Sequence, residues 1–244
     1  MLERIKSFSS PDEPIPICSD IVVAAGKGKR MHLNEKKQFL PLLGIPVLAH
    51  TLKAIQKCDM VEEIVLVVAA EDIPAAKDIL TALNDKKEVK IVAGGKTRAD
   101  SVANGLRTIK KESTSVMIHD GVRPCTPTSF MEECIKNAAK YGASSLGVTP
   151  KNPIKKIDQN GMIVSTVDRE TLVEVQTPQC FRKELIARAY ENYDPSATDD
   201  CMLVEALGVD VYVTEGSYAN LKLTTREDLI LLSALLDAQS SAEK

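Results

Sequence analysis

Short apolar runs alternate with longer, helix-like segments along most of this chain, and no other feature of the sequence constrains the fold as much. The runs are near-continuously apolar or β-branched, as in strands that are covered on both faces. They are Ile21–Ala24, Ile64–Val68, Val89–Ala93, Val116–His119 and Ser144–Val148. Helices are expected over Pro46–Lys57, Pro74–Leu83, Arg98–Lys110 and Thr128–Tyr141. The alternation predicts an α/β fold with a mainly parallel, Rossmann-like sheet flanked by helices, and ligands are expected at the carboxyl ends of its strands.

A different pattern interrupts this alternation between residues 150 and 178. Two alternating segments, Ile154–Ile157 and Met162–Val167, flank Gln159-Asn160-Gly161, and Asn-Gly is a strong hairpin signal. A two-stranded hairpin is marginally stable alone, so it needs a surface to pack on. We expect a protruding β-hairpin arm over 150–172 that serves dimerisation with a second subunit. The alternative is an edge hairpin folded back on its own sheet.

Length and composition bound the rest of the molecule. The chain has 244 residues, 44% of them hydrophobic, which suffices for one substantial core. We therefore expect residues 1–244 to form a single domain with an N-terminal extension over residues 1–20. That extension lacks a continuous apolar stretch, so it does not support a secretory signal. The net charge of −3 and the scarcity of aromatics argue against nucleic acid, and no apolar run reaches membrane-spanning length, so we expect a cytoplasmic protein that binds neither.

A glycine-rich, cationic segment follows the first predicted strand directly. It runs Ala24-Ala25-Gly26-Lys27-Gly28-Lys29-Arg30, and Lys37 comes seven residues after Arg30. Glycines let backbone N–H groups approach an anion closely, and the cationic side chains add charge to the same turn. The spacing is neither that of a dinucleotide-binding fingerprint nor that of a P-loop. The segment predicts a polyphosphate site, and the alternative is a glycine-rich turn with solvated lysines.

A carboxylate stands at the end of another predicted strand, in His119-Asp120-Gly121-Val122-Arg123. Ligand crevices lie at such ends, and a carboxylate there suits a Mg²⁺ ion that bridges phosphate oxygens. Asp120 is thus a candidate metal ligand, and Arg123 would contact an anion or orient Asp120. The alternative is a structural salt bridge. His119 has no partner at ligand spacing and is expected to be a packed histidine.

Six motifs in register resemble those of the 2-C-methyl-D-erythritol 4-phosphate cytidylyltransferase family, within the sugar-phosphate nucleotidyltransferases. In order, they are AAGKGKRM with KKQFLPLLGIPVLAHTL, then GGKTRADSVANGL, HDGVRP, VDRETLVEVQTPQCF, TDD and EGSYANLKLTTREDL. The resemblance runs from about Ile21 to the final helix. It implies transfer of CMP from CTP to 2-C-methyl-D-erythritol 4-phosphate, with release of pyrophosphate, in the non-mevalonate isoprenoid pathway. Magnesium is the expected cofactor and a homodimer the expected assembly.

The resemblance also implies roles for individual residues on the nucleotide side. Positions that would hold the nucleotide are Ala24, Ala25, Gly26, Gly28, Gly95 and Ser101, the last two at the cytidine. Arg30 and Lys37 would be catalytic, because cations fixed at the CTP phosphates stabilise the charge that builds up during in-line attack. The attacking group is already an ionised phosphate, so neither a covalent intermediate nor a general base is needed.

On the acceptor side the resemblance implies a second set of contacts. Arg169 would reach the acceptor phosphate from the neighbouring subunit, and Lys222 would act catalytically near the transferring phosphate. Thr198 and Asp199 would face the acceptor, together with Asp120 and Arg123. Thr198 is also expected to be the N-cap of a helix over Asp199–Leu207. We interpret Gln176-Thr177-Pro178-Gln179 as a structural turn that joins the arm to the domain.

Two stretches depart from the family's usual pattern. Lys36 stands where a proline is usual. Lys151-Asn152-Pro153-Ile154-Lys155 stands where the family typically has Asp-Thr-Ile-Lys, whose threonine helps to hold the acceptor phosphate. The second departure leaves a ribitol 5-phosphate cytidylyltransferase as an alternative. A catalytically silent nucleotide-binding module is a further alternative, since fold alone never establishes function, but it would be expected to lack the loop cations or Asp120.

Overall fold

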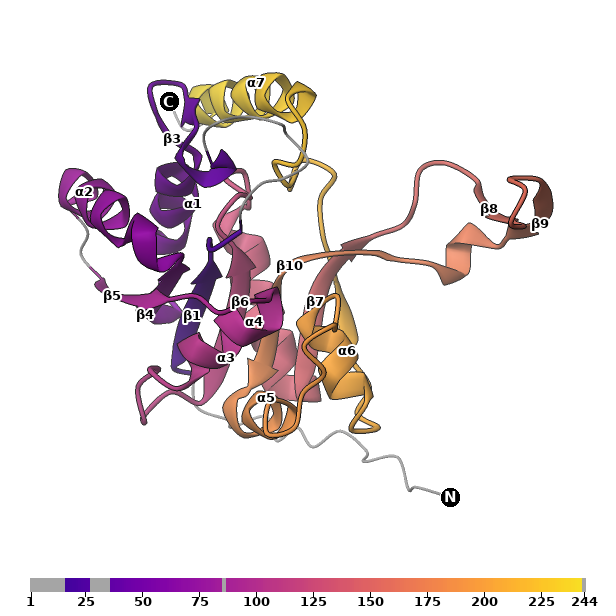
Figure 1. The fold of residues 1–244 in the computed structure, drawn as a ribbon, viewed down its shortest axis with the longest axis horizontal. Coiled ribbons are helices and arrows are strands. Elements are labelled where there is room, and N and C mark those ends of the chain that lie inside the picture. The colour runs from indigo at the N-terminus through magenta and orange to yellow at the C-terminus, as the bar shows by residue number, and fades with distance from the viewer. Residues whose placement is uncertain (1–15, 27–35, 85–86, 243–244) are drawn as a thin grey trace.

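A seven-stranded sheet forms the centre of the computed structural model, which describes residues 16–26, 36–84 and 87–242 (Figure 1). The strand order is β11-β7-β10-β6-β1-β4-β5. The bounds are β1 (Cys18–Val23), β4 (Val61–Val68), β5 (Glu88–Ala93), β6 (Ser115–Asp120), β7 (Ala143–Val148), β10 (Glu174–Arg182) and β11 (Tyr212–Glu215). Within this sheet β10 alone is antiparallel to its neighbours, and all other pairs are parallel. The predicted α/β class with a mainly parallel sheet is confirmed.

Helices cover both faces of the sheet, because side chains alternate between the faces along each strand. Val22 packs with α1 (Val47–Gln56), α2 (Ile73–Leu83) and α4 (Thr128–Tyr141). Its neighbour Ile21 points to the other face and packs with α3 (Arg98–Leu106), α5 (Lys183–Ala189) and α6 (Asp200–Glu205). The last helix, α7 (Glu227–Ala242), closes a third apolar cluster with the short strand β2 (Pro41–Leu42), which pairs with β3 (Ile45–Pro46). No helix among the described residues is long and apolar enough to cross a membrane.

The five predicted strands and four predicted helices are all present, and all but α4 have shifted ends. The first strand begins at Cys18, inside the stretch expected to be an N-terminal extension, because the polar side chains that follow Cys18 are buried in the sheet. Helix α3 ends at Leu106 rather than at Lys110. The backbone N–H of Lys110 donates to the buried Glu63 carboxylate instead of continuing the helix.

The strands β10 and β11 of the central sheet and the helix α5 were not predicted, and the interpretation of Gln176–Gln179 as a turn is wrong. This segment lies within β10, between β7 and β6. Proline normally argues against a central strand because it has no N–H to donate. Here Pro178 falls where the register of β10 with β7 shifts between Val175 and Gln179, so the strand accommodates it at an irregularity.

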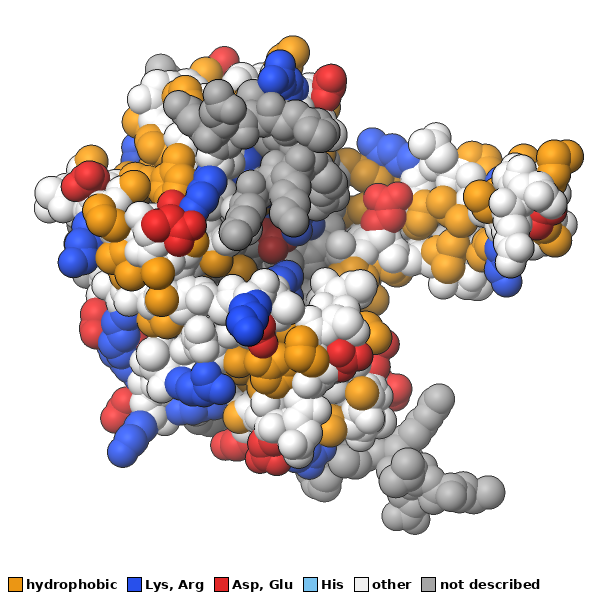
Figure 2. All heavy atoms as spheres, viewed as in Figure 1, with side chains coloured by type: hydrophobic (Ala, Val, Ile, Leu, Met, Phe, Trp, Pro, Cys, Tyr) orange, Lys and Arg blue, Asp and Glu red, His pale blue; other side chains and the backbone are white. Residues whose placement is uncertain are grey.

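The predicted hairpin arm is present and extends away from the body of the molecule (Figure 1). It contains β8 (Ile154–Ile157) and β9 (Ile163–Val167), which pair with each other in a separate two-stranded sheet, and then the 3-10 helix η4 (Arg169–Thr171). The alternative of an edge hairpin on the central sheet is therefore wrong. Hydrophobic side chains lie open on the arm, and Figure 2 shows them as orange spheres along it. Those of Ile157, Met162, Ile163 and Val164 are each more than 60% exposed.

Candidate active site

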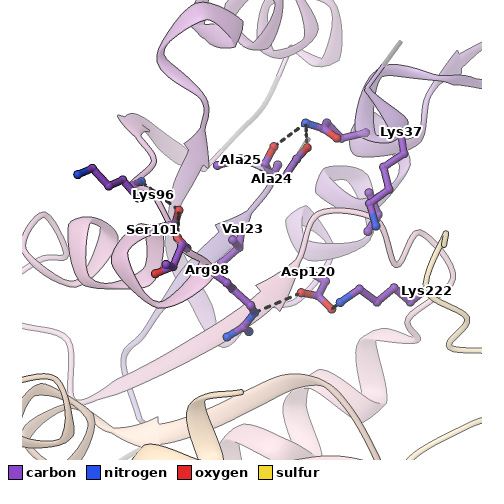
Figure 3. Close-up of a pocket in the computed structure, with 14 residues that line it drawn as sticks. Val23, Ala24, Ala25, Lys37, Lys96, Arg98, Ser101, Asp120 and Lys222 are labelled. Atoms are coloured by element: carbon purple, nitrogen blue, oxygen red, sulfur yellow. Dashed lines mark hydrogen bonds and ion pairs between the residues drawn. The ribbon is translucent and has the colours of Figure 1, made fainter. Parts of the chain in front are cut away.

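Two adjoining cavities open where strands β1 and β6 end. The larger, of about 440 Å³, is lined by Val23, Ala24, Ala25, Gly26, Lys37, Gln38, Gly95, Lys96, Thr97, Arg98, Ser101, Asp120, Val122 and Lys222 (Figure 3). The smaller, of about 260 Å³, is lined by Arg98, Asp120, Arg123, Val175, Gln176, Thr177, Gln179, Thr198, Asp199 and Lys222. Of the described residues, Arg98, Asp120 and Lys222 line both. The two cavities therefore share a wall that carries two cations and one carboxylate.

The loop after β1 forms one side of the larger cavity. Ala24 continues the strand by donating its N–H to the carbonyl of Val67 at 2.8 Å. The side-chain amide of Gln38 then donates to the carbonyl oxygens of Ala24, at 2.8 Å, and Gly26, at 3.2 Å. Gln38 is buried and anchors the loop from behind, a role that the sequence did not reveal. The two other predicted loop residues, Gly28 and Arg30, lie outside the described part of the chain.

The segment between β5 and α3 forms the opposite side. A Cβ atom on Gly95 would overlap Asp100, so only glycine fits there. The Ser101 hydroxyl accepts from the Gly95 N–H at 3.1 Å and donates to the Thr97 carbonyl at 2.9 Å. Ser101 thus shapes the Gly95 segment from within and has already used its donor. Thr97 and Asp100 form a reciprocal capping box that starts α3 at this wall.

Lys37 reaches the larger cavity from the 3-10 helix η2 (Lys37–Phe39). Its Nζ donates to the carbonyl oxygen of Leu223 at 2.9 Å, and the Leu223 N–H donates to Val122 at 2.9 Å. These bonds attach the segment before α7 to the end of β6, which brings Lys222 beside Asp120. Lys36 points elsewhere, because its Nζ lies 2.8 Å from a Glu71 oxygen and 2.7 Å from an Asp72 oxygen. The charge that replaces the usual proline is thereby paired outside the cavity.

Asp120 is an anion surrounded by three cations. Its carboxylate lies 2.7 Å from Lys222 Nζ, 3.5 Å from Arg123 Nε and 3.8 Å from Arg98 Nε. Burial acts to raise the pKa of Asp120, but the charges of Lys222, Arg98 and Arg123 outweigh it and hold the pKa well below its ordinary value. Asp120 therefore stays ionised at every physiological pH.

Arg123 and His119 flank Asp120 on its own strand end. Arg123 is buried and donates from Nη1 to the carbonyl of Asn220 at 2.7 Å, so it orients Asp120 and holds the segment that carries Lys222. His119 is fully buried, as the sequence predicted, and its Nε2 lies 3.4 Å from the Thr126 hydroxyl. Burial lowers the pKa of His119 to about 3, so the ring is neutral and packed.

The smaller cavity is built from β10 and the start of α6. Asp199 caps α6, because its Oδ1 accepts from the Met202 N–H at 3.0 Å, and its Oδ2 accepts from the Gln179 amide at 3.0 Å. The prediction that Thr198 is the N-cap is therefore wrong. Its hydroxyl lies against the Met202 sulfur at 3.9 Å, and Thr198 lines the cavity without capping the helix.

Arg169 lies apart from both cavities of its own chain. It sits on the arm, half exposed, and donates from Nη1 to the carbonyl of Lys151 at 3.1 Å and from Nε to Glu170 at 3.3 Å. Since the arm extends away from the body (Figure 1), one chain alone does not bring Arg169 to the other predicted site residues that the structure describes.

The donor set can be tested against the expected magnesium ion. Among the described residues, no group of three or more His, Cys, Asp and Glu side chains is placed to hold a metal. Asp120 is the carboxylate on the shared wall, and the cations around it disfavour a bare dication. Mg²⁺ commonly takes one or two carboxylates and completes its shell with waters and substrate phosphates. The residues therefore fit a magnesium ion that arrives with a polyphosphate, held by Asp120.

Comparison with known proteins identifies the family. The model of the family described as "IspD: 2-C-methyl-D-erythritol 4-phosphate cytidylyltransferase" matches residues 18–238. The chain belongs to this family. A cytidylyltransferase of this name from Clostridium botulinum (strain 657) is 43% identical over 222 residues, which cover 90% of this chain and 97% of the relative. One from Alkaliphilus oremlandii is 42% identical over 228 residues, covering 92% and 97%.

Solved structures of the cytidylyltransferase family share the fold. The 4-diphosphocytidyl-2C-methyl-D-erythritol synthase of Anaerococcus prevotii superposes with a TM-score of 0.80 at 32% identity, covering 92% of this chain and all of that one. The family member from Thermus thermophilus gives 0.72 at 26% identity, with coverages of 90% and 98%. The chain therefore spans essentially the whole length of its cytidylyltransferase relatives.

The site residues predicted for a cytidylyltransferase fall into separate places in the structure. Those in the wall of the larger cavity are Ala24, Ala25, Gly26, Lys37, Gly95, Ser101, Asp120 and Lys222. Those in the wall of the smaller one are Asp120, Arg123, Thr198, Asp199 and Lys222. Arg98, Gln38, Thr177 and Gln179 also line the cavities but were not predicted as site residues. Arg98 lies in one of the recognised motifs, which is the signal that could have singled it out.

Proposed function

We propose that this chain transfers CMP from CTP to 2-C-methyl-D-erythritol 4-phosphate, giving 4-diphosphocytidyl-2-C-methyl-D-erythritol and pyrophosphate. The observation that carries the proposal is the wall shared by the two cavities, with Arg98, Asp120 and Lys222 on both sides of it. Two phosphorylated substrates must bring their phosphates together, and a cationic boundary between two cavities is where they can meet. Membership of the cytidylyltransferase family supports both substrates.

CTP occupies the larger cavity in this proposal. The small residues and main chain of the Gly95 segment lie on the side suited to the pyrimidine, because backbone groups discriminate a base without adding bulk. The triphosphate then extends along the loop after β1 towards Lys37. The cytidine and the phosphates thus lie against opposite sides of the same cavity.

The acceptor occupies the smaller cavity and presents its phosphate at the shared wall. One of its phosphate oxygens forms a bond to the α-phosphorus of CTP while the bond between that phosphorus and the α–β bridging oxygen breaks. The electron pair of the broken bond leaves with pyrophosphate. No proton has to be removed from the nucleophile, because the acceptor phosphate is already ionised. Lys37 and Lys222 neutralise charge that grows during this step, which is how phosphoryl-transfer enzymes gain most of their rate.

Magnesium, held by Asp120 and the CTP phosphates, would neutralise part of the triphosphate's charge. Asp120 is suited to this because its pKa is held low, so the oxygen ligands are available without a proton to displace. Lys222 lies 2.7 Å from the same carboxylate and would exchange this contact for a phosphate oxygen when both substrates are bound.

The working unit in this proposal is a homodimer in which each arm serves the partner's site. Three observations support it: among the described residues β8 and β9 pair only with each other, the arm exposes Ile163 and Val164, and it carries Arg169 away from both cavities. Arg169 of a partner would bind the acceptor phosphate through two parallel hydrogen bonds, a geometry that arginine offers and lysine does not. We also propose a cytoplasmic location, supported by six free, buried cysteines, as is usual in a reducing compartment.

Release of pyrophosphate from CTP and magnesium tests the proposal directly. We expect release with 2-C-methyl-D-erythritol 4-phosphate at a rate at least about tenfold above that with ribitol 5-phosphate, since a site built for one polyol phosphate discriminates by its hydrogen bonds. Faster release with ribitol 5-phosphate would favour the alternative that the chain is a ribitol 5-phosphate cytidylyltransferase, which the departure at Asn152-Pro153 leaves open. Absence of release with either acceptor would favour a silent nucleotide-binding module. A Lys222→Ala preparation controls for contaminating enzymes.

A further inference from the structure

Arg98 is the third residue of the shared wall, beside Asp120 and Lys222, and the steps of the proposed reaction leave it without a catalytic role. Figure 3 shows Arg98 and Lys222 approaching the Asp120 carboxylate from opposite sides, one from the start of α3 and the other from the segment before α7. The boundary at which the two substrates' phosphates meet is therefore flanked by two cations. One of these cations is the guanidinium of Arg98, whose side chain is 25% exposed.

A buried acid fixes the Arg98 side chain. Its Nη2 lies 2.8 Å from Oδ2 of Asp200, which is completely buried. Oδ1 of Asp200 accepts from the Tyr190 hydroxyl at 2.5 Å, and the Asp200 N–H donates to Oε1 of Gln179 at 3.0 Å. Asp200 is thus held by the C-cap residue of α5 and by β10 together. Burying such an ion pair costs desolvation that its attraction often fails to recover, so stability alone is a weak reason for it.

The backbone of Arg98 is held in place as well as its guanidinium group. Arg98 is the first residue of α3, directly after the Thr97 N-cap, and the capping box fixes that end of the helix. The Tyr193 hydroxyl donates to Oδ1 of Asp100 at 2.7 Å and so ties the capping box to the chain after α5. With both ends fixed, the guanidinium needs no reorganisation when a ligand arrives, which is the condition for strong electrostatic stabilisation of a transition state.

Against the described residues, the guanidinium retains donors for a ligand. Its Nε lies 3.8 Å from Asp120, which is too long for a hydrogen bond, so Asp120 attracts the group without using that N–H. A guanidinium has five N–H donors in one plane, and the contact with Asp200 occupies only one edge. The nearby charges of Asp200 and Asp120 raise the pKa of Arg98 further, against the effect of burial, so it remains a cation throughout.

We propose that Arg98 donates hydrogen bonds to the reacting phosphates and that Asp200 positions it for this. This deepens the proposed function and rests on it. During transfer, the acceptor oxygen bonds to the α-phosphorus and the bridging bond to pyrophosphate breaks, while negative charge remains on the non-bridging oxygens between the two groups. Arg98 stabilises those oxygens and the attacking phosphate from one side of the boundary, and Lys222 does so from the other.

The test separates binding from turnover in Arg98→Lys. Lysine keeps the charge but cannot contact Asp200 and a phosphate at once, because it is a point charge without the planar fork. We expect kcat at saturation of both substrates to fall about 30-fold or more, while the Kd for CTP, measured by calorimetry without acceptor, changes less than about threefold. Arg107→Lys, at the other end of the same helix, where Arg107 bonds to Asn104, is the matched control and should leave both quantities at the parental values.

Asp200→Asn provides a second, independent variant if Arg98→Lys folds poorly. It keeps the size of the side chain and removes only the charge that holds Arg98. We expect the same pattern, and the double variant Arg98→Lys/Asp200→Asn should be no slower than the slower single variant, since both changes act on one interaction. Melting temperatures are measured alongside, and kcat is referred to folded protein.

The outcomes distinguish this inference from the proposed function. A parental protein that releases no pyrophosphate overturns both. Suppose that the parent is active. If Arg98→Lys then leaves kcat at saturation unchanged, or loses CTP affinity alone, the role of Arg98 is overturned while the proposed function stands. A multiplicative loss in the double variant overturns that role too, because it would mean that Asp200 acts independently of Arg98.

Discussion

Asp20 and Asp120 lie on the adjacent strands β1 and β6, and both side chains are buried. Asp120 is surrounded by cations and stays ionised. Asp20 lies on the same face of β1 as Cys18 and Val22, and its carboxyl oxygens have no hydrogen-bond partner among the described residues. Burial alone raises the pKa of Asp20 well above its ordinary value, so the fold holds it in the neutral form.

Asp20→Asn should stabilise the protein in a pH-dependent way. The folded-state pKa of Asp20 is raised, so below about pH 4 the carboxyl is protonated in both states and its ionisation does not affect the free energy of unfolding. Above about pH 4, unfolding releases a proton. The free energy of unfolding therefore falls by about 1.4 kcal/mol per pH unit until the pH reaches the folded-state pKa of Asp20. Asparagine stays neutral, so its advantage in urea unfolding should be larger at pH 7.5 than at pH 5.

The control for this measurement is Asp59→Asn, which changes an exposed carboxyl just before β4. It should shift the unfolding free energy by a similar small amount at both pH values. An Asp20→Asn advantage that is equal at the two pH values would contradict a neutral Asp20 in the folded state.

At the scale of elements, the turn between β5 and α3 shows how a short segment builds the larger cavity. Gly94 packs against Ala25 of the opposite loop, and Gly95 packs against Asp100 of the capping box. Both contacts leave no room for a Cβ atom. The glycine pair therefore sets the width of the cavity between the two loops and, through Asp100, the start of α3.

Gly95→Ala should weaken CTP binding and also lower the stability of the fold. The added methyl group displaces Asp100 and the Gly95 N–H together, so the cavity wall moves while the sheet beneath it does not. We expect the Kd for CTP to rise about tenfold or more, with a loss of unfolding free energy of about 1–2 kcal/mol. Thr97→Ala, which removes only the cap, serves for comparison: it should cost about 1 kcal/mol of stability with a smaller effect on Kd.

Hydrophobic periodicity was sufficient for the parallel strands, because they are buried on both faces and therefore continuously apolar. It failed for β10, where Pro178 and the polar residues around it resemble a turn and yet line a cavity in the middle of the sheet. It also failed for β11, an edge strand of four residues whose side chains are mostly exposed. These two strands depend on partners that local sequence does not reveal.

The candidate site was predictable wherever a residue type and its motif carry the chemistry, as for Lys37, Asp120 and Lys222. The contribution of Gln38 could not be predicted, because it consists of two bonds to the loop after β1. The contact between Arg98 and Asp200 could not be predicted either. The two residues are 102 positions apart in the sequence and meet only when α3 and α6 pack on one face of the sheet. Positioning contacts of this kind arise from tertiary structure.

At the scale of the whole molecule, the proposed sites require two chains. Each would combine the cavities of one subunit with Arg169 from the other. An isologous dimer of this kind has two equivalent sites, and a defect in Arg169 and a defect in Lys222 of one chain would then fall in different sites.

Complementation between two inactive variants tests this arrangement. Arg169→Ala and Lys222→Ala, co-expressed with different affinity tags, should form heterodimers with one site carrying both defects and one carrying neither. The doubly purified heterodimer should show about half of the parental kcat per dimer, because one of two equivalent sites is intact. Each variant co-expressed with itself is the control. Activity no higher than that of the homodimeric variants would contradict exchange of the arm between subunits.

The arm enters and leaves the body through β7 and β10, which are neighbours in the sheet and run antiparallel. Its two attachment points therefore lie side by side, and the whole arm amounts to an insertion into one hairpin connection. Such an insertion can be exchanged for another of different length or sequence while strand order and register stay as they are. If the arm largely determines which acceptor is used, replacing the arm would change the acceptor. Enzymes for other polyol phosphates could then be made by grafting different arms onto an unchanged nucleotide-binding body.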